Sequence, residues 1–189
     1  MTDDKLRNLK KIIGSITYTG SFLRADGIMT KRFIDICSIP TLPGGINACT
    51  EVISELMEKV GCEKIATQSK SNNVYFATHV SQKTEKDLLM ISVSEKINNK
   101  HILGRYAAGE NITIFYPLAH IYSLFSDMIG LLREEGLAVN TMVSMIKINE
   151  DIGEKLEKIG VNLISVFEFN RNTGYKLKVT DEYKKIMGV

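Results

Sequence analysis

The stretch ENITIFYPLAHIYSLF, residues 110–125, changes from strand-like to helix-like sequence at a place where ligand chemistry is expected. Residues 112–116 are an apolar run typical of a buried strand, and apolar residues then recur at helical spacing in 121–125. α/β proteins commonly bind phosphate at such a junction, because the first turn of a helix has unpaired N–H groups. His120 and Ser123 are the side chains that could contact an anion there, but the turn has no glycine and no acidic residue. His120 is more typical of a polar residue near a helix start than of an anion contact.

No other local motif predicts a reaction. The sequence has no HExxH motif, no histidine pair at ligand spacing and no cysteine cluster, so we expect no metal site. Cys37, Cys49 and Cys62 are odd in number and widely spaced, which is typical of reduced structural thiols in a cytoplasmic protein.

Composition limits the class of protein further. The chain has 189 residues, of which 44% are hydrophobic and 24% charged, and this predicts one globular domain with a sizeable core. Its formal net charge is +2 with both signs intermixed, so we expect no nucleic-acid binding. No apolar run approaches the ~20 residues of a membrane span, and the charged start does not resemble a signal peptide. We therefore expect a cytoplasmic protein that binds no membrane.

Strand-like and helix-like segments alternate over most of the chain. A first helix is expected to start at Asp3 or Asp4 and to end near Gly14, and residues 31–40 are expected to be extended up to Pro40. A clear helix follows, with Gly61 after its end and one apolar face: Ile46, Cys49, Val52, Ile53, Leu56, Met57 and Val60. Further strands are predicted at 64–67, 88–94, 111–116, 138–148 and 161–169, and further helices at 74–82, 121–136 and 150–160.

This alternation predicts an α/β fold with a central, mainly parallel sheet and helices on both faces. The strands are rich in Ile, Val, Leu and Phe without strict alternation, as expected for a sheet that is covered on both faces. Ligands of such sheets lie outside the carboxyl ends of the strands. Three loops should meet there, namely residues 68–73, 94–104 and 116–123.

In the order of these segments the chain resembles the orotate phosphoribosyltransferases, which have the type I phosphoribosyltransferase fold. The resemblance begins with GSFLRADGIMTKRFIDI, residues 20–36, which is similar to a family stretch containing a Lys-Ser-Gly turn, two aromatics and Ile-Asp. It ends with EKLEKIGVNLISVFEF, residues 154–169, which is similar to the family's last core helix and strand. It implies a single phosphoribosyltransferase-like domain, 1–189, with a hood-like segment at 1–40, an α/β core at 41–170 and a C-terminal extension at 171–189.

The resemblance also implies roles for residues, and here the chain departs from the family. The acidic pair that holds the ribose hydroxyls of phosphoribosyl pyrophosphate falls on Tyr116 and Pro117, and the phosphate loop falls on 118–123. No carboxylate remains there, and glycine, which lets a backbone approach a phosphate, is missing. The phosphate- or nucleotide-binding candidates that remain come from this loop and from the family's pyrophosphate loop: Lys70, Ser71, Asn72, Asn73, His120 and Ser123. Asparagine tolerates positive φ, so the turn of the pyrophosphate loop is expected to survive.

Two further sites differ in charge. In the family's mobile catalytic loop, Lys96 and His101 survive as the catalytic candidates, whereas an arginine is replaced by an acidic residue. The same segment is also typical of a solvated hairpin. Of the residues facing the base, Phe22 matches, but Ala25 replaces a lysine and Asp26 replaces a serine. An anionic orotate would therefore meet a carboxylate.

These departures predict an orotate phosphoribosyltransferase-like protein of pyrimidine nucleotide metabolism with weak or lost transferase activity. Two alternatives stay open. One is an active orotate phosphoribosyltransferase that makes orotidine monophosphate from orotate and phosphoribosyl pyrophosphate, and the other is a nucleotide-sensing or partner-binding regulatory subunit. Magnesium, held on substrate oxygens, would be needed only for retained transfer. The resemblance also implies a homodimer and a phosphoribosyl pyrophosphate or nucleotide ligand.

Overall fold

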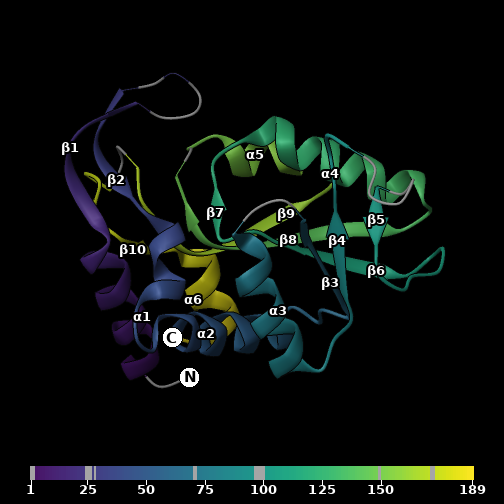
Figure 1. Cartoon of the computed structure of the whole chain (residues 1–189), viewed down its shortest axis with the longest axis horizontal. Helices are drawn as coiled ribbons and strands as arrows, with labels where there is room; N and C mark the ends of the chain where they lie inside the picture. The colour runs from purple at the N-terminus through teal and green to yellow at the C-terminus, as the bar shows by residue number, and fades with distance from the viewer. Residues whose placement is uncertain are drawn as a thin grey trace.

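The computed structural model describes residues 3–23, 27, 29–69, 72–95, 101–148, 150–170 and 173–189. Its central sheet lies between two layers of helices (Figure 1). This arrangement confirms the α/β fold with a mainly parallel sheet that the alternating segments predict. No helix in the described residues is long and apolar enough to cross a membrane.

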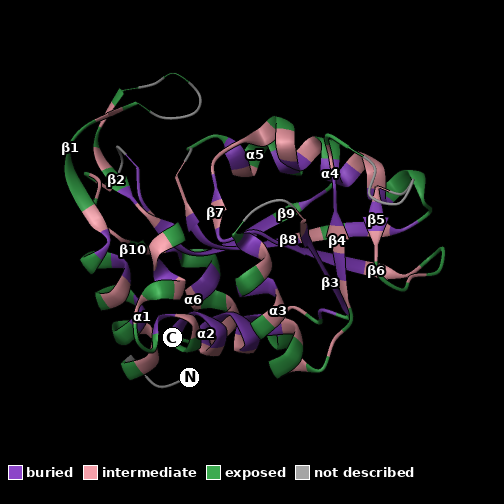
Figure 2. Ribbon diagram, in the orientation of Figure 1, coloured by how far each residue is buried: buried purple, intermediate pink, exposed green. Residues whose placement is uncertain are grey.

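The core of the sheet is a set of five parallel strands in the order β9-β8-β6-β3-β4. Their bounds are β3 (Lys64–Gln68), β4 (Leu88–Ile91), β6 (Asn111–Phe115), β8 (Ala138–Lys147) and β9 (Asn162–Glu168). Two short antiparallel strands flank them, β5 (Ile102–Leu103) beside β4 and β10 (Lys178–Val179) beside β9. Figure 2 shows the central strands mostly buried. Burial on both faces explains why the apolar runs in the sequence do not alternate.

Helices cover both faces of the sheet. One layer contains α1 (Asp3–Ser15), α2 (Gly45–Lys59), α3 (Asn73–Thr84) and α6 (Asp181–Met187), and the other contains α4 (Tyr122–Glu134) and α5 (Ile152–Glu157) (Figure 1). Each layer packs on the sheet through its own hydrophobic cluster. The apolar face predicted for α2 is confirmed, because its central residues, from Cys49 to Met57, are at most 2% exposed. Burial of this face is the main stabilising contribution of the helix.

The segment after the first helix differs from its prediction. Residues 31–34 are extended, as predicted, but Ile36–Thr41 form a 3-10 helix, η1, that contains Pro40. Asp35 starts this tight turn, since its carboxylate accepts a hydrogen bond from the Ser38 hydroxyl at 2.5 Å and its carbonyl accepts one from the Ser38 N–H at 3.0 Å. The prediction of an extended chain up to Pro40 is therefore wrong in its second half.

A separate two-stranded hairpin precedes η1. Its strands are β1 (Thr17–Leu23) and β2 (Met29–Ile34), which pair antiparallel with an irregularity between Thr19 and Phe22. The sequence did not predict β1. In Figure 1 the hairpin extends away from the helical layer at one end of the central sheet.

The C-terminal segment packs as part of the core. Tyr183 of α6 is fully buried, and α6 packs against α2 and β9. Thr180 caps this helix by accepting a hydrogen bond from the Tyr183 N–H at 3.2 Å. The cap and the buried ring together fix the last helix on the sheet.

Candidate functional site

At the carboxyl ends of the adjacent strands β3 and β6, the chain leaves the sheet toward opposite faces. β3 leads into α3 on one face of the sheet, whereas its neighbour β6 leads into α4 on the opposite face (Figure 1). Ligands of open α/β sheets commonly bind beside the carboxyl ends of strands at such a point. The fold therefore directs attention to the loops after β3, β4 and β6.

Hydrogen bonds connect these loops along the edge of the sheet. The Tyr116 hydroxyl, after β6, donates to Oε1 of Gln68 at the end of β3, over 3.1 Å. The Ser69 N–H donates to the last carbonyl of β4 over 2.8 Å, and the Ser92 N–H donates to the His101 carbonyl over 2.8 Å. The described parts of the three loops that the topology predicts to meet therefore lie at one edge of the sheet.

The loop after β3 keeps polar groups at this edge. Asn72 is exposed and Asn73, the first residue of α3, is buried, whereas Lys70 and Ser71 lie outside the described residues. The expected positive φ is not found, because Asn72 has φ −58° and Asn73 is already helical. The hydroxyls of Ser69 and Ser92 are buried, and the described part of the chain gives neither a hydrogen-bond partner. Buried hydroxyls usually have one, so a bound polar ligand would stabilise this edge.

The junction after β6 is filled by packing. Tyr116 is only 7% exposed, and its ring meets Phe125 edge-on at 5.0 Å. Pro117 offers its carbonyl to the backbone N–H groups of Met145 and Ile146, each at 3.1 Å. The next two residues form β7 (Leu118–Ala119), which pairs with β8. The first two residues of the predicted phosphate loop, 118–123, are therefore bonded into the sheet.

The two polar side chains of this junction lie beyond β7. His120 is half-buried, and its Nδ1 lies 2.8 Å from the Leu118 carbonyl oxygen. Ser123 is exposed in the first turn of α4. Ile121 precedes this helix and provides no side-chain cap, so a ligand could meet the first N–H groups of α4.

The catalytic candidates are described only in part. His101 lies at the start of β5, and its Nδ1 is 2.8 Å from the Ser92 carbonyl oxygen. When Nδ1–H donates to this carbonyl, Nε2 is the ring nitrogen left for a ligand. Lys96 lies outside the described residues.

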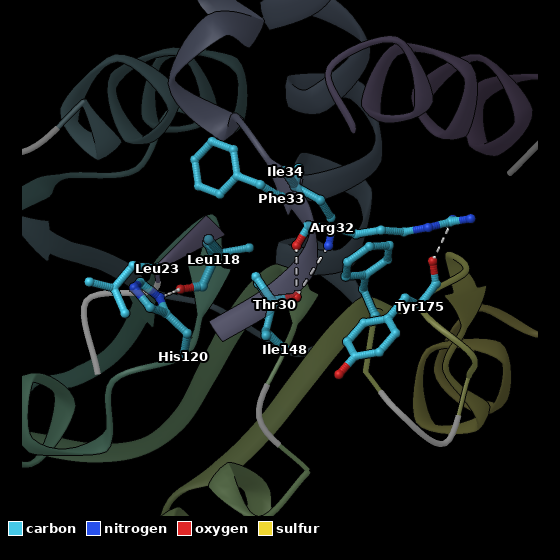
Figure 3. A pocket seen from close by; sticks show the side chains of 10 residues that line it. Leu23, Thr30, Arg32, Phe33, Ile34, Leu118, His120, Ile148 and Tyr175 are labelled. Atoms are coloured by element: carbon cyan, nitrogen blue, oxygen red, sulfur yellow. Dashed lines mark hydrogen bonds between the residues drawn. The ribbon is translucent and has the colours of Figure 1, made fainter. Parts of the chain in front are cut away.

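A cavity of about 180 Å³ lies between the hairpin and the carboxyl ends of β7, β8 and β9. We call it the apolar cavity (Figure 3). Its walls are mainly hydrophobic, and its polar groups come from Thr30, Arg32, His120 and Tyr175. Among the predicted base-facing residues, Phe22 does not line it but stacks at 5.5 Å on Phe33, which does. Ala25 and Asp26 lie outside the described residues.

Sequence reasoning missed Arg32 and Tyr175 as members of this site. Every second residue of β2 faces inward, so Thr30, Arg32 and Ile34 are less exposed than their neighbours. The residue types of β2 do not show this alternation, because the apolar Met29 and Phe33 are exposed whereas Arg32 faces inward, so no sequence signal identifies Arg32. Tyr175 is not marked either, because it comes from a turn after the last core strand.

A partly buried cluster of paired charges lies at the opposite end of the sheet. Lys64, at the start of β3, is 8% exposed and donates to Glu110 at 2.6 Å and to the Arg105 carbonyl at 2.7 Å. The hydrogen bond from Lys64, with a second from the Ala107 N–H, holds the pKa of Glu110 below its usual value. This cluster joins β3 to the loop before β6 and has a structural role.

Metal and thiol chemistry receive no support from the geometry. The described residues contain no group of three or more His, Cys, Asp or Glu side chains that could hold a metal ion. The three cysteines are free thiols, with Cys37 exposed and the other two buried. Burial raises the pKa of Cys49 to about 12, so this thiol stays protonated.

Comparison with characterised proteins identifies the relatives of this chain. No family model matches it. The orotate phosphoribosyltransferase of Methanocella arvoryzae is 26% identical over 179 residues, which are 92% of this chain and 99% of that protein. The orotate phosphoribosyltransferase of Methanosarcina mazei is 24% identical over 156 residues, which are 82% of each chain.

Solved structures agree with this relationship at the level of the fold. The crystal structure of orotate phosphoribosyltransferase from Aeropyrum pernix superposes with a TM-score of 0.72 at 17% identity, covering 96% of this chain and 99% of that one. The Mycobacterium tuberculosis H37Rv enzyme in complex with 5-phospho-α-D-ribosyl 1-diphosphate superposes with a TM-score of 0.69 at 10% identity, covering 89% and 91%. The chain therefore has the type I phosphoribosyltransferase fold, and its sequence is similar to orotate phosphoribosyltransferases.

Proposed function

We propose that this chain belongs to the orotate phosphoribosyltransferase family, acts in pyrimidine nucleotide metabolism and binds a phosphoribosyl ligand with weak or lost transferase activity. The observation that carries the proposal is the pair Tyr116 and Pro117 at the end of β6, in a fold shared with these transferases. Neither residue has a carboxylate that could bind a ribose hydroxyl. Tyr116 is packed into the core, and Pro117 uses its carbonyl within the sheet.

The size of the loss follows from the missing hydrogen bonds. A hydrogen bond to a charged group contributes roughly 1.5–3 kcal/mol, and two carboxylates could each form one with a ribose hydroxyl. Losing both would cost about 3–6 kcal/mol, which corresponds to roughly 10²–10⁴ in kcat/KM. The junction also has no carboxylate that could bind magnesium, so no side chain there would hold the metal for a reaction.

An active orotate phosphoribosyltransferase is the second candidate, and a specific observation favours it. The curated relatives reported above are both orotate phosphoribosyltransferases, and they cover at least 82% of this chain. The comparisons support this candidate more directly than a loss of activity. The weak-activity proposal depends instead on the residues at the β6 junction. In an active enzyme Lys96 and His101 would supply the catalytic charges.

The remaining polar groups support ligand binding. The buried hydroxyls of Ser69 and Ser92 would gain hydrogen-bond partners from a bound anion. On our proposal the phosphates lie near Asn72, His120 and the start of α4, and the base enters the apolar cavity. The ligand of the M. tuberculosis structure, 5-phospho-α-D-ribosyl 1-diphosphate, has the phosphate groups of such a ligand but no base.

Steady-state kinetics with orotate, Mg²⁺ and phosphoribosyl pyrophosphate test the proposal. We expect a turnover number well below ~1 s⁻¹, the lower end of the usual enzyme range. A turnover number at or above that value would refute weak activity and establish the second candidate. Binding of phosphoribosyl pyrophosphate or orotidine monophosphate is read from the rise in melting temperature, which grows with ligand concentration relative to Kd.

A pair of histidine variants locates that binding. We expect His120→Ala to reduce the ligand-induced shift, because His120 lies beside the start of α4. His79→Ala is the matched control, since Nδ1 of His79 also meets a backbone carbonyl, Tyr75 at 2.8 Å, but on the exposed face of α3. Equal shifts in both variants and the parent chain would exclude His120 from the site. Binding without turnover would support a nucleotide-sensing role.

We also propose that the chain forms a homodimer, as the family resemblance implies. The hairpin carries four exposed large hydrophobic side chains: Tyr18, Leu23, Met29 and Phe33. A second copy that covers this hairpin would remove them from water.

A further inference from the structure

A second hollow, of about 330 Å³, lies next to the apolar cavity. Residues of α1, β1, β2 and the turn at 174–177 form its walls, and we call it the cationic hollow. Arg32, Phe169 and Tyr175 line both spaces and so form the partition between them. In Figure 3 the guanidinium of Arg32 reaches past Tyr175, away from His120, and so toward the cationic hollow.

Three cations meet in this hollow without a compensating acid. Lys10 comes from α1, Arg32 from β2 and Lys176 from the turn, and no carboxylate is among the lining residues. Within the described part of the chain none of the three forms an ion pair. Glu168, which precedes the lining residue Phe169, pairs with Lys178 at 3.3 Å. An uncompensated group of like charges in a hollow attracts anions.

The turn that carries Lys176 is fixed before any ligand binds. Tyr175 has φ +54°, a left-handed conformation that is uncommon for a residue with a side chain. Its N–H donates to the Asn170 carbonyl at 2.8 Å, and its own carbonyl accepts a hydrogen bond from Arg32 at 3.0 Å. Reciprocal hydrogen bonds between Asn170 and Thr173, at 3.0 and 3.2 Å, support the same turn. The guanidinium is therefore held in place through one of its five N–H donors.

Hydroxyl groups complete the chemistry of the hollow. Thr17 and Thr19 of β1 lie on its wall. The Thr17 hydroxyl donates to the Ile13 carbonyl at 2.7 Å, so toward a ligand its oxygen can only accept a hydrogen bond, such as one from the P–O–H group of a protonated phosphate. Lysine and arginine beside threonine form a set of partners suited to phosphate oxygens, because charge-assisted hydrogen bonds to phosphate are short and strong.

We propose that the cationic hollow binds the phosphate group of a small ligand at a site separate from the carboxyl ends of β3 and β6. The site depends on α1, the hairpin and the 174–177 turn, and it makes no use of Asn72, His120 or Ser123. Because Arg32 and Tyr175 also line the apolar cavity, an occupied hollow restrains one wall of that cavity.

The test is a titration of the protein with inorganic pyrophosphate, followed by ¹H–¹⁵N NMR at low ionic strength. We expect saturable shifts of the backbone amides of Gly14, Thr17, Thr19 and Lys176. The variant Lys10→Gln/Lys176→Gln should bind at this place at least about tenfold more weakly, because it removes two of the three charges. Both lysines are exposed, so the fold should be retained.

The matched control is Lys11→Gln/Lys31→Gln, which removes the same two charges from α1 and β2 at exposed positions that line neither cavity. It should keep the parent affinity. Shifts confined to residues 69–73 and 120–123, or equal weakening in both variants, would overturn the proposal. The outcome does not depend on transferase activity, because the test reads the position of the shifted amides.

Discussion

Replacing Tyr116 by aspartate would restore one carboxylate of the family's acidic pair, and we expect it to destabilise the protein instead of reviving a reaction. The Tyr116 ring is 7% exposed and packs edge-on against Phe125 at 5.0 Å. Truncating a large buried aromatic side chain costs about 3–5 kcal/mol, and the lost hydrogen bond to Gln68 adds about 1 kcal/mol. The sum of roughly 4–6 kcal/mol is a large part of the ~5–15 kcal/mol that stabilises a typical protein.

Urea unfolding followed by circular dichroism measures this effect. With an m-value of about 1–3 kcal/mol per molar, the midpoint for Tyr116→Asp should fall by more than ~1 M. Tyr116→Phe keeps the ring and should lose only about 1 kcal/mol. Tyr106→Phe is the matched control, because its hydroxyl also donates over 3.1 Å, but to Glu135 at the surface, and it should change little.

One result would refute this reasoning. If Tyr116→Asp unfolded at the same urea concentration as the parent chain, the ring would not hold the junction between β6 and α4. The strand end would then be open to a ligand, and the explanation of weak activity by packing would fail.

Three further predictions concern charge, thiols and assembly. The pKa of Glu110 is lowered in the folded state, so its contribution to stability is present at neutral pH and is lost as the pH falls below the pKa of the unfolded state. The urea midpoint of Glu110→Gln should therefore differ from that of the parent chain more at pH 7 than at pH 3. In native protein at pH 8, iodoacetamide should modify only Cys37. Cys49 and Cys62 should react only after unfolding in urea, as measured by mass spectrometry. Light scattering at micromolar concentration should give about twice the chain mass of 21.2 kDa, and a value near 21.2 kDa would exclude the dimer.

The sequence predicted the parts of the fold in which local pattern and burial agree. In α2 every third or fourth residue is apolar, and that face is the one packed on the sheet. The core strands could be read from their apolar runs. β1 could not, because the stretch TYTGSFL is mostly exposed and contains a glycine, so its pairing with β2 decides its structure. η1 was missed because a short turn between Asp35 and Ser38 outweighs the extended appearance of the sequence.

The position of the candidate loops could be predicted from the sequence, but the residues that line the cavity could not. Topology alone placed the three loops at one edge of the sheet, since parallel strands have their carboxyl ends together. The apolar cavity depends on a contact between the hairpin and residues more than a hundred positions later, such as Ile148 and Tyr175. No local pattern encodes such a contact, and for that reason Arg32 and Tyr175 were not found.

β7 explains how the chain can keep this fold without a phosphate at the β6 junction. A phosphate-binding loop directs backbone N–H groups at its ligand, and these groups lack partners when the ligand is absent. Here Leu118 and Ala119 pair with the end of β8, the Pro117 carbonyl accepts from two of its N–H groups, and the Ala119 carbonyl accepts from the Ile148 N–H at 3.0 Å. The first residues of the junction are thus bonded within the sheet, through the pairing of Leu118 and Ala119 with β8 and through the carbonyls of Pro117 and Ala119. Affinity for a phosphate at this junction must then come from side chains and from the start of α4, which is a weaker arrangement than a loop of backbone donors.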